Sequence, residues 1–216
     1  MLSCENIQAI KDEFNYTMCP KTLALLEIWY DNFIEYNSHT NLMSAGDVKN
    51  IFAKHIFDSL AILKWDEFDP NKKQKILDVG TGGGFPSVIL AICFPELEII
   101  ANDSRIKKIN FIAEIKDKLD LKNLKFSYAR IEDLEPYDCD IVISRAVGKI
   151  KDVWQLSKKH LKSGGHFVIY KSKTLNEELE NFKAKYKEID EKNIKTVPYN
   201  LPLKEEFERY LAIIKG

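Results

Sequence analysis

A short apolar run that ends in a glycine-rich turn stands at residues 76–86, which read ILDVGTGGGFP. Glycine fills four of the five positions from 80 to 84. Because glycine has no side chain, such a stretch allows a sharp backbone turn and lets another group approach the backbone closely. A glycine-rich turn directly after a strand indicates a site for a nucleotide-like ligand. The chemistry of that ligand depends on the surrounding residues.

From residue 75 onward, short apolar runs alternate with amphipathic segments. The runs that read as strands are residues 75–80, 97–103, 124–130, 139–146, 166–171 and 207–216. The segments with helical spacing of apolar residues are 86–94, 104–121, 151–161 and 174–188. This alternation predicts an α/β fold, in which a mostly parallel sheet carries helices on both faces. Ligands of such sheets bind at the carboxyl ends of the strands. The loops expected at that edge follow residues 80, 103, 130, 145 and 171.

The first 65 residues have a different character. Residues 21–37 and 47–65 both carry apolar side chains at helical spacing, with Asp47 as the expected N-cap of the second helix. We therefore expect two parts, a helical cap over residues 1–65 and a ligand-binding domain over residues 66–216.

Composition excludes several classes of protein. The longest apolar run, residues 88–94, is too short to cross a bilayer, and the opening MLSCENIQAIKDEF is too polar for a signal peptide. We therefore expect a cytoplasmic monomer without membrane association. The four cysteines stand far apart with no CxxC pair, which favours reduced thiols over a zinc site.

The charge of the chain is unevenly distributed. A net charge of −1 argues against a globally basic nucleic-acid binder. The stretch from Arg145 to Lys173, however, holds eight basic residues and a single acidic residue, Asp152. Such a run is either a solvated face or a surface that neutralises the phosphates of a polyanion. The sequence leaves both interpretations open.

The glycine-rich turn departs from the spacing that dinucleotides favour. In the pattern G-x-G-x-x-G the third glycine lets the helix approach the strand, whereas Phe85 fills that position here. Asp78 would repel a pyrophosphate but suits S-adenosylmethionine, which carries a sulfonium and an ammonium group and no phosphate. Asp103 ends the second strand, where an acid can bind ribose hydroxyls, and Ser104 is placed to cap the next helix. Because dinucleotides use the same acid, a nicotinamide cofactor stays an alternative.

Several segments in order make a resemblance specific. They read TNL (40–42), KHIFDSL (54–60), DVGTGGGFP, ANDSRIKKINFI, ARIED and VISRA. Over residues 25–175 the chain resembles the GidB/RsmG family of bacterial ribosomal RNA methyltransferases. The resemblance implies a Rossmann-like S-adenosylmethionine-dependent methyltransferase fold, with a seven-stranded, mostly parallel sheet and an N-terminal helical extension. It also implies methylation of N7 of a guanine in 16S rRNA, within the small ribosomal subunit or an assembly intermediate.

Functional residues follow from this resemblance and from the turn itself. By position, the residues expected to contact the methyl donor are Gly80, Phe85, Ile131, Glu132 and Arg145. The turn and strand ends add Asp78, Gly82, Gly84 and Asp103. The residues expected near the RNA are His55, Arg130, Arg145 and Lys171. Glu132 has a second interpretation, because the acids from 132 to 140 also fit a solvated loop.

Arg145 is the expected catalytic residue. At the end of the fourth strand its planar donors can hold a phosphate or the edge of guanine, although an ion pair with one of the acids at 132–140 is the alternative. Guanine N7 already presents a lone pair, so its methylation needs alignment of donor and acceptor rather than a strong base. We interpret His55 and Asp58, three residues apart on an expected helix, as a packed histidine hydrogen-bonded to a carboxylate.

Three other functions stay open at this point. They are a nicotinamide-dependent oxidoreductase, a non-enzymatic RNA-binding module, and a methyltransferase that acts on a small molecule.

Overall fold

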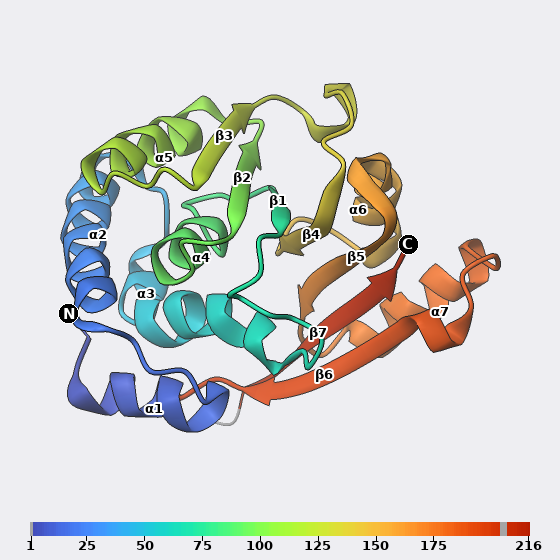
Figure 1. Cartoon of the computed structure of the whole chain (residues 1–216), viewed down its shortest axis with the longest axis horizontal. Helices are drawn as coiled ribbons and strands as arrows, with labels where there is room; N and C mark the ends of the chain where they lie inside the picture. The colour runs from blue at the N-terminus through green and yellow to red at the C-terminus, as the bar shows by residue number, and fades with distance from the viewer. Residues whose placement is uncertain (1, 204–206) are drawn as a thin grey trace.

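A computed structural model describes residues 2–203 and 207–216 of the chain. Its centre is a seven-stranded sheet in the order β3-β2-β1-β4-β5-β7-β6 (Figure 1). The strands are β1 (Lys75–Val79), β2 (Glu98–Asp103), β3 (Leu124–Tyr128), β4 (Cys139–Arg145), β5 (Leu161–Lys171), β6 (Ile194–Asn200) and β7 (Glu208–Lys215). Strands β1 to β5 run parallel, and β7 and β6 add an antiparallel hairpin at one side. The predicted α/β class with a mostly parallel sheet is confirmed.

Helices cover both faces of the sheet. The α-helices are α1 (Cys4–Phe14), α2 (Pro20–Thr40), α3 (Ala45–Val48), α4 (Ser87–Cys93), α5 (Ile106–Lys118), α6 (Ile150–Ser157) and α7 (Leu175–Lys185). Shorter helical turns are η1 (Phe52–Phe57), η2 (Leu60–Lys64), η3 (Ile131–Asp133), η4 (Lys158–His160) and η5 (Glu191–Asn193). The N-terminal helices, α4 and α5 lie on one face, and α6 and α7 lie on the other (Figure 1).

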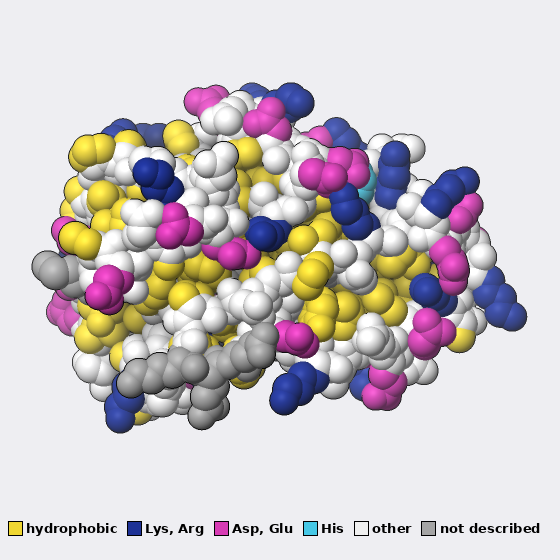
Figure 2. Space-filling view, turned by 90° about the horizontal axis from the view of Figure 1, so that it is seen from below, with side chains coloured by type: hydrophobic (Ala, Val, Ile, Leu, Met, Phe, Trp, Pro, Cys, Tyr) yellow, Lys and Arg dark blue, Asp and Glu magenta, His cyan; other side chains and the backbone are white. Residues whose placement is uncertain are grey.

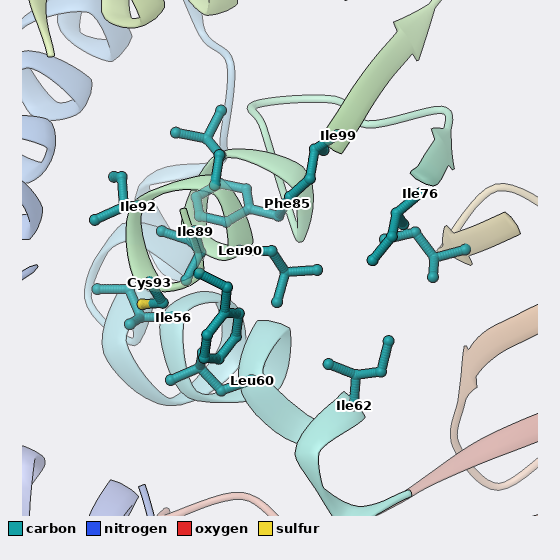
Figure 3. Packing of buried hydrophobic residues seen from close by; sticks show 14 of the residues in the cluster. Ile56, Leu60, Ile62, Ile76, Phe85, Ile89, Leu90, Ile92, Cys93 and Ile99 are labelled. Carbon is teal, nitrogen blue, oxygen red and sulfur yellow. The ribbon is translucent and has the colours of Figure 1, made fainter. Parts of the chain in front are cut away.

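Neighbouring side chains along each strand point into two separate cores. Ile76 belongs to the core beneath α4 and α5, and Leu77 belongs to the core beneath α6 and α7. In the first core, Phe85 and Leu90 pack together with Leu60 of the N-terminal segment (Figure 3). Burial of each such side chain contributes about 1.5–3 kcal/mol. The N-terminal helices thus form a layer on the sheet, and the division of the chain at residue 65 stays a prediction.

The predicted start of the second N-terminal helix is wrong. Its N-cap is Ser44, whose Oγ accepts a hydrogen bond from the Asp47 amide at 3.2 Å. Asp47 lies in the first turn, where its carboxylate accepts a hydrogen bond from the Ser44 hydroxyl at 2.8 Å. After α3 the chain continues as the π-helical turn η1 and the 3₁₀ turn η2, so residues 47–65 do not form one α-helix.

Ser104 does not cap α5 either. The amide of Arg105, which occupies the N-cap position, donates a hydrogen bond to Asp103 Oδ1 at 2.9 Å. This bond fixes the backbone just before α5, and no side chain caps the first turn of the helix.

Pattern analysis did not predict strand β6 because its sequence, IKTVPYN, lacks a regular apolar pattern and contains Pro198. It pairs only with β7 and forms one edge of the sheet. Proline is tolerated there because an edge strand has no neighbour on one side. Strand β5 also begins earlier than expected, at Leu161.

Among the described residues, no helix combines the length and apolarity needed to cross a bilayer. All four cysteines are free thiols; Cys93 and Cys139 are buried, and Cys4 and Cys19 are exposed.

Candidate active site

The glycine-rich turn lies between β1 and α4, at the carboxyl edge of the sheet. Gly80 has a φ of +72° and Gly84 a φ of +90°, in the left-handed region that residues with a Cβ rarely adopt. A Cβ on Gly80 would lie 2.4 Å from Cγ2 of Val147, and one on Gly84 would lie 2.4 Å from Cγ2 of Val88. The turn needs glycine at both positions for its backbone shape and for close packing with other parts of the protein.

The backbone amides of this turn are used inside the protein. The amides that donate to protein oxygens are those of Gly80, Thr81, Gly82, Gly84, Phe85 and Ser87, and within the described residues the Gly83 amide has no such partner. Gly82 donates to Asp103 Oδ2 at 3.0 Å, and Ser87, at the start of α4, donates to Asp78 Oδ2 at 3.2 Å. A dinucleotide fold binds pyrophosphate through free amides at this place. This turn therefore offers no comparable cradle.

A first hollow of about 340 Å³ opens where the loops after β1, β2, β3 and β4 meet. Its apolar wall consists of Ile131, Val147, Val153 and Leu156, and the acids Asp103 and Glu132 also line it. Val147 and Leu156 are 45% and 40% exposed, so these apolar surfaces are accessible to a ligand. Apolar walls with a few polar groups are typical of sites for small organic ligands.

A second hollow of about 280 Å³ adjoins the first, because Gly80, Arg105 and Ala146 line both. The side chains of its wall that carry charge or aromatic character are those of Asp47, His55, Phe85, Arg105, Lys108 and Arg145. Two hollows joined at the glycine-rich turn can hold a ligand that spans both, or a ligand in one and its reaction partner in the other.

A larger cavity of about 600 Å³ lies between the α1–α2 connection, the end of α4 and the segment before β3. No loop from the carboxyl end of a strand reaches it, and ligands of parallel sheets bind at the carboxyl ends. We therefore place the candidate site at the two hollows.

A buried ionic cluster holds Arg145. The carboxylate of Asp58, only 1% exposed, accepts hydrogen bonds from Arg145 Nη1 at 2.9 Å and from the Tyr199 hydroxyl at 2.6 Å. It also accepts two bonds from Arg209, both at 3.1 Å. Burial opposes ionisation of Asp58, but the two guanidinium groups outweigh it and hold the pKa of this carboxyl below its usual value. Since one carboxylate serves two arginines, the cluster has an excess of positive charge.

His55 supports Arg145 from the other side. Arg145 Nη2 donates to His55 Nδ1 at 2.8 Å, so the ring proton is on Nε2, which has no partner among the described residues. Burial, followed by the neighbouring Arg145, lowers the pKa of His55 to about 3. The imidazole is therefore neutral near pH 7. His55 and Asp58 do not bond to each other, so that interpretation is wrong: each binds Arg145 instead.

Comparison with known proteins decides the family. The family model described as rRNA small subunit methyltransferase G, named GidB, matches residues 22–203. The chain belongs to the GidB family. It is 34% identical to ribosomal RNA small subunit methyltransferase G of Bacillus thuringiensis and 32% identical to that of Bacillus cytotoxicus. Each of these comparisons covers 99% of this chain and 90% of the relative.

Solved structures of low identity share the fold. A SAM-dependent O-methyltransferase from Thermotoga maritima is 17% identical, with a TM-score of 0.55 over 79% of this chain and 69% of that chain. A ribosomal protein L11 methylase from Lactobacillus delbrueckii subsp. bulgaricus is 13% identical, with a TM-score of 0.54 over 74% and 77%. The sheet of this GidB-family protein is thus a Rossmann-like methyltransferase sheet, as the resemblance implied.

In this GidB-family chain, Asp78 lies behind the glycine-rich turn and lines neither hollow. It is fully buried, and its Oδ1 has no partner within residues 2–203 and 207–216. Burial raises its pKa to about 7. The Asp78 carboxyl group holds the start of α4, and its contact with the donor stays a prediction. Gly84 also lines neither hollow, since it packs against Val88.

Other predicted donor contacts lie where a ligand can reach them. Gly80 and Asp103 line the first hollow, and so do Ile131 and Glu132. Gly82 lines the second hollow. Contact of these residues with a donor stays a prediction.

Phe85 and Arg145 meet at the wall of the second hollow. The guanidinium carbon of Arg145 lies 5.3 Å from the centroid of the Phe85 ring, and the His55 ring lies 4.8 Å from the same centroid. Arg145 does not pair with the acids at 132–140, because Asp58 binds it. Arg130 is exposed at the rim of the first hollow, with Nη1 3.9 Å from Glu132 Oε1.

Lys171, which was expected near the RNA, is bound within the protein, and its contact with RNA stays a prediction. Its ammonium group forms an ion pair with Glu178 at 2.7 Å and donates to the carbonyl oxygen of Gly148 at 2.5 Å. The Lys171 side chain is 11% exposed and lines neither hollow. Its charge is used inside the protein.

The basic stretch from Arg145 to Lys173 does not form one continuous surface. Arg145 and Lys171, each 11% exposed, form ion pairs with Asp58 and Glu178, and Lys162 forms an ion pair with Asp140. On the face shown in Figure 2, basic and acidic side chains are intermingled along the rim. Three of the eight basic side chains in this stretch are thus balanced by carboxylates.

Pattern analysis missed Tyr199, Arg209 and Glu178. Arg209 had one available signal, because it is a charged residue at the start of the apolar strand β7. Tyr199 lies on the unexpected strand β6, and Glu178 is one of several acids on an amphipathic helix, so neither carried a local signal.

Proposed function

We propose that this protein transfers a methyl group from S-adenosylmethionine to N7 of a guanine in 16S rRNA. The observation that carries the proposal is the pair of hollows that meet at Gly80. The first has an apolar wall with carboxylates, and the second has Arg145 beside a neutral His55. Membership of the GidB family supports the ribosomal substrate.

The residues present fit a phosphate-free adenosine. Ile131 and Leu156 offer apolar surface for adenine, and the carboxylates of Asp103 and Glu132 can accept hydrogen bonds from hydroxyl groups. Asp103 Oδ1 accepts two hydrogen bonds from Arg105 and Oδ2 accepts one from Gly82, so Oδ2 has further acceptor capacity. All described amides of the glycine-rich turn except that of Gly83 donate to protein oxygens, which favours this donor over a nicotinamide dinucleotide.

S-adenosylmethionine supplies, when bound, an electrophilic methyl group on a sulfonium. The protein's part is to align and shield the acceptor, because guanine N7 presents a lone pair and no proton has to be removed. Neither His55 nor Asp58 is a free base, since both accept hydrogen bonds from Arg145.

Arg145 is placed to hold the acceptor. Three of its five N–H donors bind Lys54, His55 and Asp58. Two remain for a guanine edge or a phosphate. The excess positive charge of the cluster with Arg209 favours the approach of RNA.

The test is methylation of small ribosomal subunits that lack the modification, with labelled S-adenosylmethionine and mapping of the label. We expect label on guanine N7, and a rate on the order of 100-fold lower for Arg145→Lys, whose ammonium cannot reproduce the planar donor geometry. Lys125→Met, which changes an exposed pair on β3, is the matched control and keeps the wild-type rate. Label on another atom, or tight RNA binding without methyl transfer, contradicts the proposal.

We infer from the ribosomal substrate that the enzyme acts in the cytoplasm, as a monomer, on the small subunit or an assembly intermediate. Parallel assays with naked 16S rRNA and with assembled subunits distinguish these substrates. Sedimentation of the protein with and without subunits tests the monomer.

A further inference from the structure

Residues 146–149, which connect β4 to α6, lie between the two hollows. Ala146 lines both hollows, and Val147 belongs to the apolar wall of the first. Val147 packs directly against Gly80: a Cβ added to Gly80 would lie 2.4 Å from Cγ2 of Val147. Ala146 has a φ of +58°, a left-handed conformation that is unfavourable for a non-glycine residue. Surrounding contacts must therefore hold this connection in place.

Two charged side chains from other elements hold the end of the connection. Lys171, the last residue of β5, donates to the Gly148 carbonyl oxygen at 2.5 Å. Glu178, on α7, accepts a hydrogen bond from the Ile150 amide at 2.8 Å. Lys171 Nζ and Glu178 Oε2 are 2.7 Å apart, so the two anchors form one unit.

The anchoring unit is built into the protein and has no surface for a ligand. The side chains of Lys171 and Glu178 are 11% and 10% exposed and line neither hollow. Both oxygens of Glu178 have partners, because Oε1 accepts a bond from the Thr174 hydroxyl at 2.8 Å. Their charges therefore act through the segment that they hold.

We propose that Lys171 and Glu178 are positioning residues for binding of the methyl donor. They hold residues 146–149 so that Val147 completes the apolar wall of the first hollow beside Gly80. The inference rests on the proposed function, since it concerns the affinity for S-adenosylmethionine. Loss of the Lys171–Glu178 pair lets residues 146–149 move, so Val147 no longer completes the wall and donor binding weakens. Arg145, which precedes these residues, keeps its hydrogen bonds to His55 and Asp58.

The test compares Lys171→Met with Tyr186→Phe. Tyr186, at the end of α7, donates hydrogen bonds to Gln155 (2.9 Å) and to the Lys151 carbonyl oxygen (3.3 Å) of α6. It has no hydrogen bond to residues 146–149 among the described residues. Titration calorimetry with S-adenosylmethionine and S-adenosylhomocysteine gives the affinity. We expect Kd to rise about tenfold for Lys171→Met, which corresponds to about 1.4 kcal/mol, and to stay unchanged for Tyr186→Phe.

Two further readouts separate positioning from general damage. Hydrogen exchange of the ligand-free protein should be faster at the amides of residues 147–150 in Lys171→Met and unchanged there in Tyr186→Phe. In the methylation assay, KM for the donor should rise while kcat at saturating donor stays close to wild type. Lys171→Arg, which keeps the charge and can donate to both partners, should restore most of the affinity.

An unchanged Kd, or tighter donor binding, in Lys171→Met overturns the inference. Should that variant fail to fold, Glu178→Gln provides the same test, because the amide keeps the shape and an acceptor for Ile150 but removes the counter-charge of Lys171. If the wild-type protein binds neither S-adenosylmethionine nor its product, the proposed function itself fails. Wild-type binding together with an unaffected Lys171→Met variant overturns only the positioning role.

Discussion

Asp58 Oδ2 lies 2.9 Å from Arg145 Nη1, although 87 positions separate the two residues in the chain. The contact joins the N-terminal helical segment to the carboxyl end of β4. Arg209 of β7 and Tyr199 of β6 bind the same carboxylate. One buried acid therefore connects three distant parts of the chain to the residue that we expect to hold the acceptor.

Replacement of Asp58 by Asn tests this connection. The variant leaves two guanidinium groups without a buried counter-charge, which costs about 3–5 kcal/mol when one partner of a buried pair is removed. We expect a large decrease in the free energy of unfolding in urea and loss of methyl transfer. Asp66→Asn, in the exposed pair with Lys195, should leave the unfolding midpoint unchanged. Wild-type stability of Asp58→Asn would show that the cluster is dispensable.

Replacement of Gly80 by Ala tests the glycine-rich turn. The added Cβ collides with Val147, and the φ of +72° is unfavourable for alanine. We expect a loss of about 1–3 kcal/mol of stability and loss of donor binding in calorimetry. Gly46→Ala is the control, because Gly46 lies in α3 and its nearest neighbour to an added Cβ is Ser44 Oγ at 3.9 Å. That variant should be as stable as the wild type or more so. Equal behaviour of the two variants contradicts the close packing at Gly80.

His55 should make the protein less stable as the pH falls. Its pKa is about 3 in the native protein and about 6.5 in an unfolded chain, so the unfolded state takes up the proton first. This contribution to stability is fully present above about pH 6.5 and is lost toward pH 3, by at most about 1.4 kcal/mol per pH unit. His55→Gln should flatten this part of the curve of unfolding free energy against pH. The same change at the exposed His39 should keep the wild-type slope.

Asp78 should act in the opposite direction over the same range. Burial raises its native pKa to about 7, so the native state holds the proton more tightly than the unfolded chain. Its contribution to stability is present below about pH 4 and declines as the pH rises through 7. Asp78→Asn cannot ionise, so its stability relative to the wild type should improve between pH 4 and 7 and level off above. A constant difference across that range would mean that Asp78 is ionised in the native protein.

Pattern analysis missed one strand of the sheet, β6, and the start of β5. Alternation of apolar runs with helical segments is a local property, and it correctly located β1 to β4 and β7. Strand β6 is largely exposed, contains Pro198 and lies at an edge, where burial imposes no pattern. Helix starts also failed, since Ser44 took the capping role expected of Asp47 and no side chain caps α5.

The position of the site followed from local sequence, because the carboxyl ends of parallel strands must share one edge. Hence the loops after residues 80, 103, 130, 145 and 171 could be expected to meet; the first four line one hollow, and the loop after residue 171 lines neither hollow. Only the tertiary structure determines which ion-pair partner each charged side chain has. Arg145 binds Asp58 and Lys171 binds Glu178 because the order of the strands and the N-terminal layer bring these residues together. No spacing along the chain encodes such contacts, since the energy of a buried ion pair depends on burial and geometry that arise only in the assembled sheet.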